Sequence, residues 1–308
     1  MDAMQHPSAH STSGRSLDGH DNVAVNHGHY ENFPVASLLC PARLRPPILA
    51  IYRFARTADD IADEGDATPE DRVQTLKDYA VCLDAAMSGA PIKDRWPEVF
   101  RPLAQIAQSH ALPSEPLHDL LRAFTQDCGQ PLYADRAHLL NYCRRSANPI
   151  GRLLLHLYAI DDPRALAQSD AVCTALQLIN FWQDPSVDLR RGRNYFPLQD
   201  LQRHGLTHED VQSGKDTPAT QAVLRDLTQW AAELMTFGSP LVHQVPGRLG
   251  WELRLVIQGG LRIIAKITQM NHRTLTLRPH LTALDYPVML WQAIRISSSH
   301  LASTGERP

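Results

Sequence analysis

The chain has 308 residues and a formal net charge of −3, so it lacks the strongly basic footprint that is typical of nucleic-acid-binding proteins. Its five scattered cysteines form no CxxC pair, which argues against a disulfide framework and against a zinc site. No run of 18 apolar residues predicts a membrane-spanning helix, and the N-terminal stretch has no signal-peptide core. We therefore expect a cytoplasmic protein, with peripheral contact at the inner face of the membrane as an open alternative.

Residues 1–29 are rich in Ser, Gly, Asn, Asp and His and contain few apolar side chains. Such a composition cannot bury enough apolar surface to offset the entropy of ordering, which predicts a disordered tail. A metal-binding tail is the alternative, because five histidines lie there: His6, His10, His20, His27 and His29.

Residues 30–298 show an almost entirely helical pattern, and alternating strand patterns are absent. We predict one all-α domain over 30–298, followed by a flexible C-terminal tail at 299–308. Thr68 and Pro69 form a typical helix start, with Thr68 as the N-cap. Apolar residues recur at helical spacing in eight segments: 44–62, 73–87, 117–124, 139–157, 166–182, 222–237, 253–270 and 284–296.

The first acidic run lies near the end of the segment 44–62. Tyr52, Arg56, Asp59 and Asp63 follow one another at spacings of four, three and four, which places them on one helix face. Arginine suits forked contacts with diphosphate oxygens, and carboxylates suit Mg²⁺. The alternative is a solvated acidic helix end with an Arg–Asp pair.

The second acidic run has the same kind of spacing about 120 residues later. Gln177, Asn180, Asp184 and Asp188 share a helix face, and apolar residues surround this polar stripe. Two such faces turned toward each other would enclose carboxylates that need a cation, most simply Mg²⁺ carrying a phosphate-rich substrate. Pro185 directly follows Asp184, so we expect a helix break that displaces Asp188 relative to Asp184.

Three arginines follow this run and suit an anionic ligand. The alternative is that they pair with nearby carboxylates. The arginines are Arg190, Arg191 and Arg193, and the carboxylates are Asp184, Asp188 and Asp200.

A third segment, from Tyr142 to Gly151, contains small residues and Pro149 inside a helical pattern. It predicts a helix break that could line a pocket, and a plain helix–helix junction is the alternative. Gly259 and Gly260 in a late helix predict close helix packing, with a pocket wall as the alternative.

Together the three segments resemble the squalene/phytoene synthase family. The matching stretches are 52–63, 142–151 and 177–197, and the resemblance spans about residues 30–275. It implies an isoprenoid synthase-like helical fold with a central active-site cavity. It also implies roles for individual residues. Those around Mg²⁺ and diphosphate are Asp59, Asp63, Asn180, Asp184 and Asp188, Arg56 contacts the diphosphate, and Tyr52 and Gln177 line the pocket.

Within the family, residues 31–37, 146–149 and 180–184 look most like the hydroxysqualene synthases of the hopanoid pathway. This branch acts on presqualene diphosphate and ends with water. Condensing members usually carry small hydroxyl residues near position 32 and Val-Ala-Gly at 146–148, whereas this chain has Asn32 and Ser146-Ala147-Asn148. They also carry Arg at 183 and a late-helix Tyr, where this chain has Gln183 and Leu261.

The expected reaction is ionisation of presqualene diphosphate, rearrangement of a cyclopropylcarbinyl cation, and capture by water. Asp59, Asp63, Asp184 and Tyr52 would act at the reacting centre, and Asn148 would position the water. Further wall candidates are Phe54 and Trp182, for which core packing is the alternative. The substrate would contact Asn32, Arg56, Tyr142, Gln177 and Arg193.

Three other functions stay open on the sequence. They are head-to-head condensation of prenyl diphosphates to presqualene diphosphate, squalene or phytoene, reductive squalene synthesis with NADPH, and a non-catalytic helical scaffold. Both acidic runs are intact, which argues against the scaffold. Association with neighbouring enzymes of the squalene pathway is also open.

Overall fold

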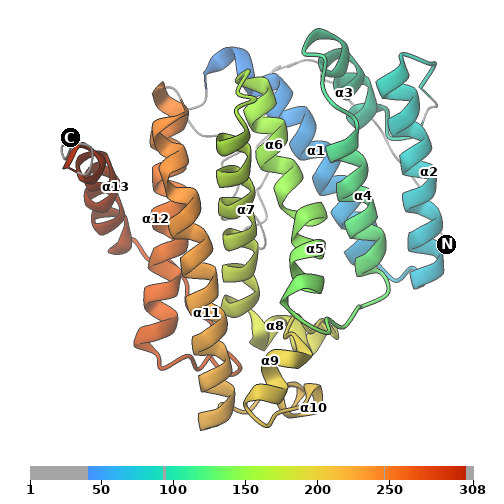
Figure 1. Cartoon of the computed structure of the whole chain (residues 1–308). Coiled ribbons are helices and arrows are strands. Elements are labelled where there is room, and N and C mark those ends of the chain that lie inside the picture. Colours follow the sequence, from blue (N-terminus) through green and yellow to red (C-terminus); the bar gives the residue numbers. More distant parts are fainter. Residues whose placement is uncertain (1–40, 93–94, 246, 303–308) are drawn as a thin grey trace, which may run out of the picture. The chain divides into compact units, whose positions relative to one another are not determined.

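The computed structural model describes residues 41–92, 95–245 and 247–302, with side chains described as far as Ile296. The predicted tail at 1–29 and Asn32 lie outside these residues. Within the described ranges the chain forms helices and no strand, which confirms the all-α prediction (Figure 1).

The long helices match the predicted segments, with one addition and one division. A helix at Pro97–Ser109 was not predicted, and the segment 139–157 consists of two helices. The main helices are α1 (Arg45–Asp63), α2 (Pro69–Ser88), α3 (Pro97–Ser109), α4 (Glu115–Asp127), α5 (Arg136–Ser146), α6 (Asn148–Leu157), α7 (Pro163–Gln183), α11 (Pro218–Gly238), α12 (Gly247–Gln269) and α13 (Asp285–Ala302). Shorter helices are α8 (Pro185–Asp188), α9 (Leu198–Arg203) and α10 (His208–Gln212).

Local sequence explains where several helices begin. Thr68 caps α2 as predicted, because its hydroxyl accepts a hydrogen bond from the Asp71 amide at 3.2 Å and Pro69 takes the first helical position. Asp135 and Asp162 cap α5 and α7 in the same way. The helix α2 ends at Ser88 and is capped by Gly89, whose φ of 74° is a left-handed conformation that glycine adopts without strain.

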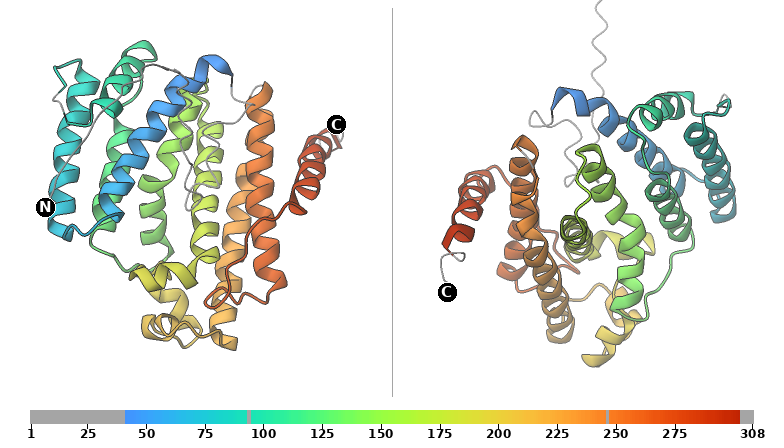
Figure 2. Two further views of the ribbon diagram at one scale, coloured as in Figure 1. Left: turned by 180° about the vertical axis from the view of Figure 1, so that it is seen from behind. Right: turned by 45° about the horizontal axis from the view of Figure 1, so that its top comes forward.

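Helix α7 packs between α6 on one side and α11 and α12 on the other (Figures 1 and 2). Glycines allow these close contacts. A Cβ at Gly151 of α6 would lie 2.4 Å from the Ser169 hydroxyl of α7, and one at Gly238 of α11 would lie 2.7 Å from the Gln168 carbonyl oxygen. A Cβ at Gly260 of α12 would also touch α7, 3.1 Å from Ile179. Of the late glycine pair, Gly260 therefore has the predicted packing role, whereas a Cβ at Gly259 would make only an ordinary contact.

The two predicted helix breaks are present. Helix α5 ends at Ser146 and α6 begins at Asn148, with Ala147 between them in a non-helical conformation. Helix α7 ends at Gln183, because Pro185 forces Asp184 out of helical geometry, to φ −109° and ψ 17°. The chain then resumes a helical turn as α8, which carries Asp188.

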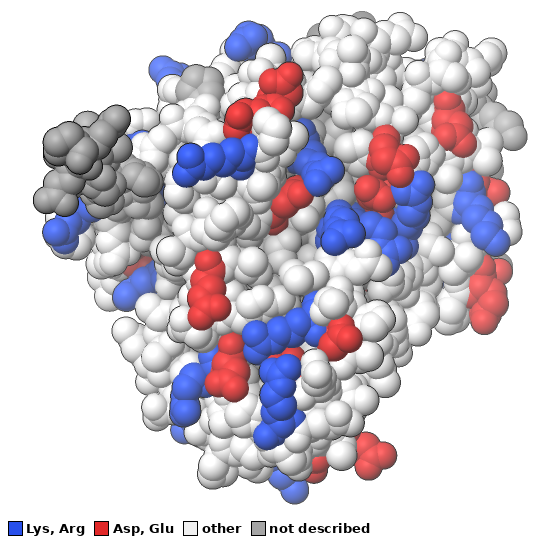
Figure 3. Space-filling view, in the orientation of Figure 1, with Lys and Arg blue, Asp and Glu red and all other residues white. Residues whose placement is uncertain are grey.

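The remaining fold predictions are met in part. Helix α13 runs to Ala302, so it enters the stretch 299–308 that was predicted as a flexible tail. None of the described helices is both long and apolar enough to cross a membrane. The cysteines among the described residues, Cys82, Cys128, Cys143 and Cys173, are free thiols. On the face drawn in Figure 3, basic and acidic side chains are interspersed rather than gathered into one basic patch.

Candidate active site

The end of α1 carries an arginine surrounded by carboxylates. Arg56 contacts Asp59 at 3.1 Å, Asp60 at 2.6 Å and Glu64 at 2.8 Å. The Arg–Asp pair that was one interpretation of this run is thus present. Tyr52 lies one turn earlier on the same helix and is half-buried. The charge of Arg56 is already balanced locally, so it serves first to hold the acidic helix end together.

Arg193 joins the two acidic runs. Its guanidinium forms an ion pair with Asp63, 130 residues away in the chain. The alternative that the arginines of this segment pair with Asp200 is wrong for Arg193, because Asp200 is held by Arg136 at 2.8 Å and Arg203 at 2.9 Å. The segment that follows the second run therefore contacts the first run through Arg193, whereas the shared metal site stays a prediction.

Asp127, the last residue of α4, belongs to the same cluster and was not predicted. Burial raises the pKa of its carboxyl to about 7, and the nearby charges of Asp63 and Asp59 add to this effect, while a hydrogen bond from Tyr142 and the charge of Arg193 oppose it. The Tyr142 hydroxyl donates to it at 2.9 Å. No spacing pattern singles out this isolated acid in the sequence, so only the packing of α4 beside α1 reveals it.

Asp59 on α1 also has a raised pKa. Burial raises the pKa of its carboxyl to about 6, Asp63 raises it further, and Arg56 lowers it. Both acids therefore lie in a region where negative charge is poorly compensated. Such perturbed carboxyls are characteristic of functional sites.

Asp188, in the second run, has a side-chain oxygen without a hydrogen-bond partner. The side chain is buried, and the unpartnered atom is Oδ2. Burial raises the pKa of the carboxyl to about 7, and Asp184 raises it further, while Arg193, Arg191 and Arg278 lower it. A buried carboxylate oxygen without a partner is costly, which indicates that a cationic ligand completes this position.

Asp184 has a partner that the sequence did not reveal. It is 2% exposed and accepts two hydrogen bonds from Arg278. One is donated by Nε at 2.6 Å and the other by a terminal nitrogen at 3.0 Å. Two further bonds tie the chain that follows α12 to this region. The Gln183 amide donates to the Pro279 carbonyl at 2.8 Å, and the Ser186 amide donates to the Thr274 carbonyl at 3.2 Å.

Aromatic rings lie next to the acidic cluster. Phe181 and Tyr195 stack with their centroids 3.7 Å apart, and Tyr142 lies 6.2 Å from each of them. Phe54 and Trp182, which were candidates for the pocket wall, are fully buried in the core. Phe54 packs against Tyr79 with centroids 5.4 Å apart, so core packing is the role that the contacts of Phe54 support.

The remaining predicted site residues that the structure describes lie on α6 and α7. Gln177 and Asn180 are half-buried on α7. Asn148 is buried at the start of α6 and accepts a hydrogen bond from the Thr174 hydroxyl at 2.9 Å, which ties α6 to α7. Its role in positioning water stays a prediction.

The donor set fits Mg²⁺ in its chemistry. Carboxylate oxygens are the ligands that Mg²⁺ prefers, and the raised pKa values and the unpartnered Asp188 Oδ2 indicate missing positive charge. Among the described residues, however, no three acidic, histidine or cysteine side chains are grouped closely enough to hold a metal ion. The present arrangement is a carboxylate cluster bridged by arginine.

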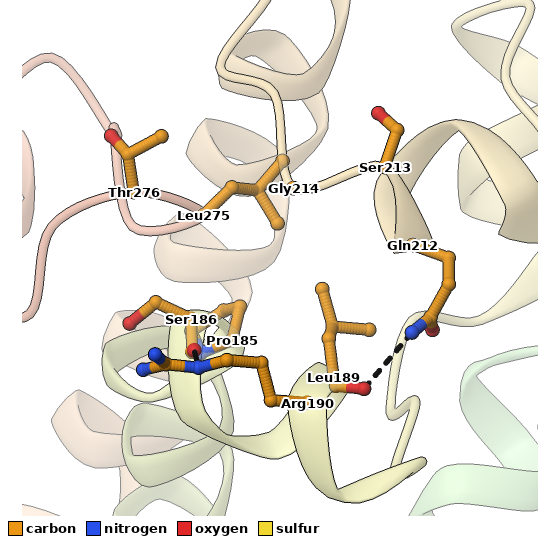
Figure 4. Close-up of a pocket in the computed structure, with 9 residues that line it drawn as sticks. All are labelled: Pro185, Ser186, Leu189, Arg190, Gln212, Ser213, Gly214, Leu275 and Thr276. Carbon is orange, nitrogen blue, oxygen red and sulfur yellow. Dashed lines mark hydrogen bonds between the residues drawn. The ribbon is translucent and has the colours of Figure 1, made fainter.

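A separate surface hollow of about 310 Å³ lies against α8 (Figure 4). Hydrogen bonds fix its wall, from Arg190 Nε to the Ser186 carbonyl at 2.6 Å and from the Gln212 amide to the Leu189 carbonyl at 2.9 Å. Its lining includes Arg190, one of the arginines predicted to suit an anionic ligand, but none of the carboxylates of the two acidic runs. A central active-site cavity stays a prediction. The lining residues are Pro185, Ser186, Leu189, Arg190, Gln212, Ser213, Gly214, Leu275 and Thr276.

Comparison with known proteins places these features in one family. Residues 26–285 match the model of the squalene/phytoene synthase family. The hydroxysqualene synthase of Rhodopseudomonas palustris is 33% identical over 86% of this chain and 88% of its own length. The presqualene diphosphate synthase of Zymomonas mobilis is 28% identical over 75% of this chain and 77% of its own length. The crystal structure of squalene synthase HpnC from Alicyclobacillus acidocaldarius superposes with a TM-score of 0.73 at 35% identity, covering 82% of this chain and 91% of that one.

Proposed function

The chain belongs to the squalene/phytoene synthase family, and from this membership we propose that it converts presqualene diphosphate and water to hydroxysqualene and diphosphate. The observation that carries the proposal is the group of carboxylates at the ends of α1, α4 and α8, of which Asp188 is buried and the others are half-buried, with Arg193 paired to Asp63. The choice within the family is supported by the greater similarity to the hydroxysqualene synthase than to the presqualene diphosphate synthase.

The carboxylate cluster is the proposed site for Mg²⁺. When bound, the ion would balance the charge of the departing diphosphate. Asp127 would complete the acidic surroundings, with its carboxyl held by Tyr142. The proposed ligands are Asp59, Asp63, Asn180, Asp184 and Asp188.

Arginines of the site would receive the diphosphate. Arg56 and Arg193 both border Asp59 or Asp63, and each carries a guanidinium that can donate two parallel hydrogen bonds to phosphate oxygens. Arg278 would act similarly beside Asp184. Their fixed positive charges favour departure of the diphosphate and formation of the carbocation.

The rest of the site would guide the cation to water. The rings of Tyr142, Phe181 and Tyr195 can stabilise positive charge through cation–π contacts of about 1–2 kcal/mol each without reacting with it. Tyr52 and Gln177 would line the substrate pocket, and the Asn148 amide would orient the attacking water. The water oxygen forms the new C–O bond and its proton passes to solvent, so the reaction needs no reductant.

Purified protein with Mg²⁺ should convert presqualene diphosphate to hydroxysqualene and diphosphate in equal amounts. Farnesyl diphosphate supplied alone should remain unchanged, because the proposed reaction begins from the C30 cyclopropyl substrate. Gas chromatography with mass spectrometry of the lipid extract distinguishes the alcohol from squalene. Consumption of farnesyl diphosphate would instead establish the condensing alternative.

The same assay with NADPH tests the reductive alternative. We expect the alcohol to be the product with and without NADPH, since capture by water involves no hydride. A switch to squalene when NADPH is added would show that the cation is reduced, and the proposed water-terminated reaction would then be wrong.

Metal-free protein should lose thermal stability as pH rises from 6 to 8. The folded-state pKa values are about 6 for Asp59 and about 7 for Asp127 and Asp188, against an ordinary value of about 3.9. The folded state therefore retains protons that the unfolded state has released, so the free energy of unfolding falls as pH rises through this window. Scanning calorimetry should show a melting temperature several degrees lower at pH 8 than at pH 6.

Added Mg²⁺ should recover most of this loss at pH 8, because a ligand that binds only the folded state stabilises it. The matched control is the Asp127→Asn/Asp188→Asn double variant, whose melting temperature should change less with pH. An equal change in both proteins would assign the pH dependence to other groups.

A further inference from the structure

The outward face of α13 is apolar. Met289 and Ala293 are buried, and Met289 lies on the α12 side, where a Cβ at Gly259 would come within 3.5 Å of its terminal methyl group. The opposite face presents large side chains to solvent, each between 37% and 62% exposed. They are Tyr286, Val288, Leu290, Trp291 and Ile294.

Residues 285–296 present no exposed carboxylate, because Asp285 is the one acidic residue of this stretch and it is buried. Asp285 is 1% exposed and is held by two cations of α12, by Arg262 Nε at 2.6 Å and by Lys266 Nζ at 2.8 Å. Arg295 is the one cation in this stretch, and its guanidinium lies 4.4 Å from the centre of the Trp291 ring. The helix thus offers solvent an apolar stripe bordered by positive charge.

A second pair, on α12, has the same chemistry. Trp251 on α12 is 40% exposed, and the Arg254 guanidinium lies 5.0 Å from the centre of its ring. Tryptophan and arginine combine an apolar body with a polar or charged group, which is the combination found where a protein meets the membrane–water interface.

From these observations we propose that α13 binds the surface of a phospholipid bilayer, with its apolar stripe in the boundary between headgroups and acyl chains. Stable protein interfaces use about 20–30 residues a side, whereas this stripe offers five large side chains on one helix. A lipid surface needs no complementary shape, and anionic headgroups complement Arg295. The proposal does not depend on the identity of the substrate.

Flotation with vesicles tests the proposal. The full chain should float with vesicles of phosphatidylcholine and phosphatidylglycerol, and the triple variant Leu290→Ser/Trp291→Ser/Ile294→Ser should bind at least tenfold more weakly. The matched control is Val81→Ser/Leu132→Ser, which replaces side chains that are 53% and 62% exposed elsewhere and should bind like the unaltered chain. Arg295→Gln should weaken binding several-fold on anionic vesicles and much less on pure phosphatidylcholine.

Fluorescence locates the contact. Brominated lipids should quench part of the tryptophan emission, and Trp291→Phe should remove most of that quenching while the circular dichroism melting curve stays unchanged. Two results would overturn the proposal. One is flotation of the folded triple variant equal to that of the unaltered chain. The other is failure of the unaltered chain to float while it sediments as a dimer that the triple variant converts to a monomer, which would assign the stripe to a second copy.

Discussion

Asp59→Asn and Asp184→Asn are each expected to lower kcat/KM for presqualene diphosphate at least about 100-fold. Each change removes a negative charge from the proposed metal site, and loss of one preorganised electrostatic contact at a reacting centre typically costs about 100- to 1000-fold. The two residues come from α1 and from the junction of α7 with α8, so equal losses would show that both acidic runs serve one site. Release of diphosphate measures the rate.

The control is Asp78→Asn, which makes the same chemical change at an exposed residue of α2 that pairs with Arg95. It should keep at least half of the activity. Circular dichroism should show that all three variants fold, because Asp184→Asn leaves Arg278 near a neutral amide that still accepts hydrogen bonds. Turnover that is unchanged in Asp59→Asn and Asp184→Asn would show that the metal-assisted mechanism is wrong.

Gly238→Ala should cause the largest loss of stability from one added methyl group. The new Cβ would lie 2.6 Å from Val172 Cγ2, 2.7 Å from the Gln168 carbonyl oxygen and 2.9 Å from the Val172 amide nitrogen. Two of these atoms are backbone atoms of α7, so relief requires α7 and α11 to separate. We expect a loss of about 3 kcal/mol in the free energy of unfolding, at the upper end for overpacking, and a melting temperature lower by about 6 °C or more.

Gly259→Ala is the matched control, because its Cβ would make only an ordinary contact with Met289, at 3.5 Å. Alanine in a helix interior stabilises relative to glycine by about 0.5–1 kcal/mol, so this variant should melt slightly higher. If the two variants melted at the same temperature, the crossing of α7 and α11 would be less tight than the structure indicates.

The sequence predicted the parts of the molecule that depend on local pattern. Helical spacing predicted the all-α fold class, and Thr68 marked the start of one helix correctly. Pro149 and Pro185 marked helix breaks that the structure contains. The helix at Pro97–Ser109 was not predicted, although Pro97 occupies the first helical turn, where no backbone donor is lost.

The candidate site was predictable only where its residues recur in one helix. Asp59 and Asp63 were found through their spacing, and so was the run that ends at Asp188. Asp127 and Arg278 are single residues that reach the cluster through tertiary packing, so no periodicity identifies them. Likewise, the pairing of Arg193 with Asp63 spans 130 residues and depends on how α1 lies against the end of the α7–α8 segment.

The connection between α12 and α13 limits how far this chain can be shortened. It contains none of the residues expected to bind the metal, but its Arg278 donates hydrogen bonds to Asp184. Two of its backbone carbonyls accept hydrogen bonds from Gln183 and Ser186. A fragment ending with α12 would keep both acidic motifs and still leave Asp184 buried without its arginine. The smallest autonomous catalytic unit therefore extends well past the last recognisable motif.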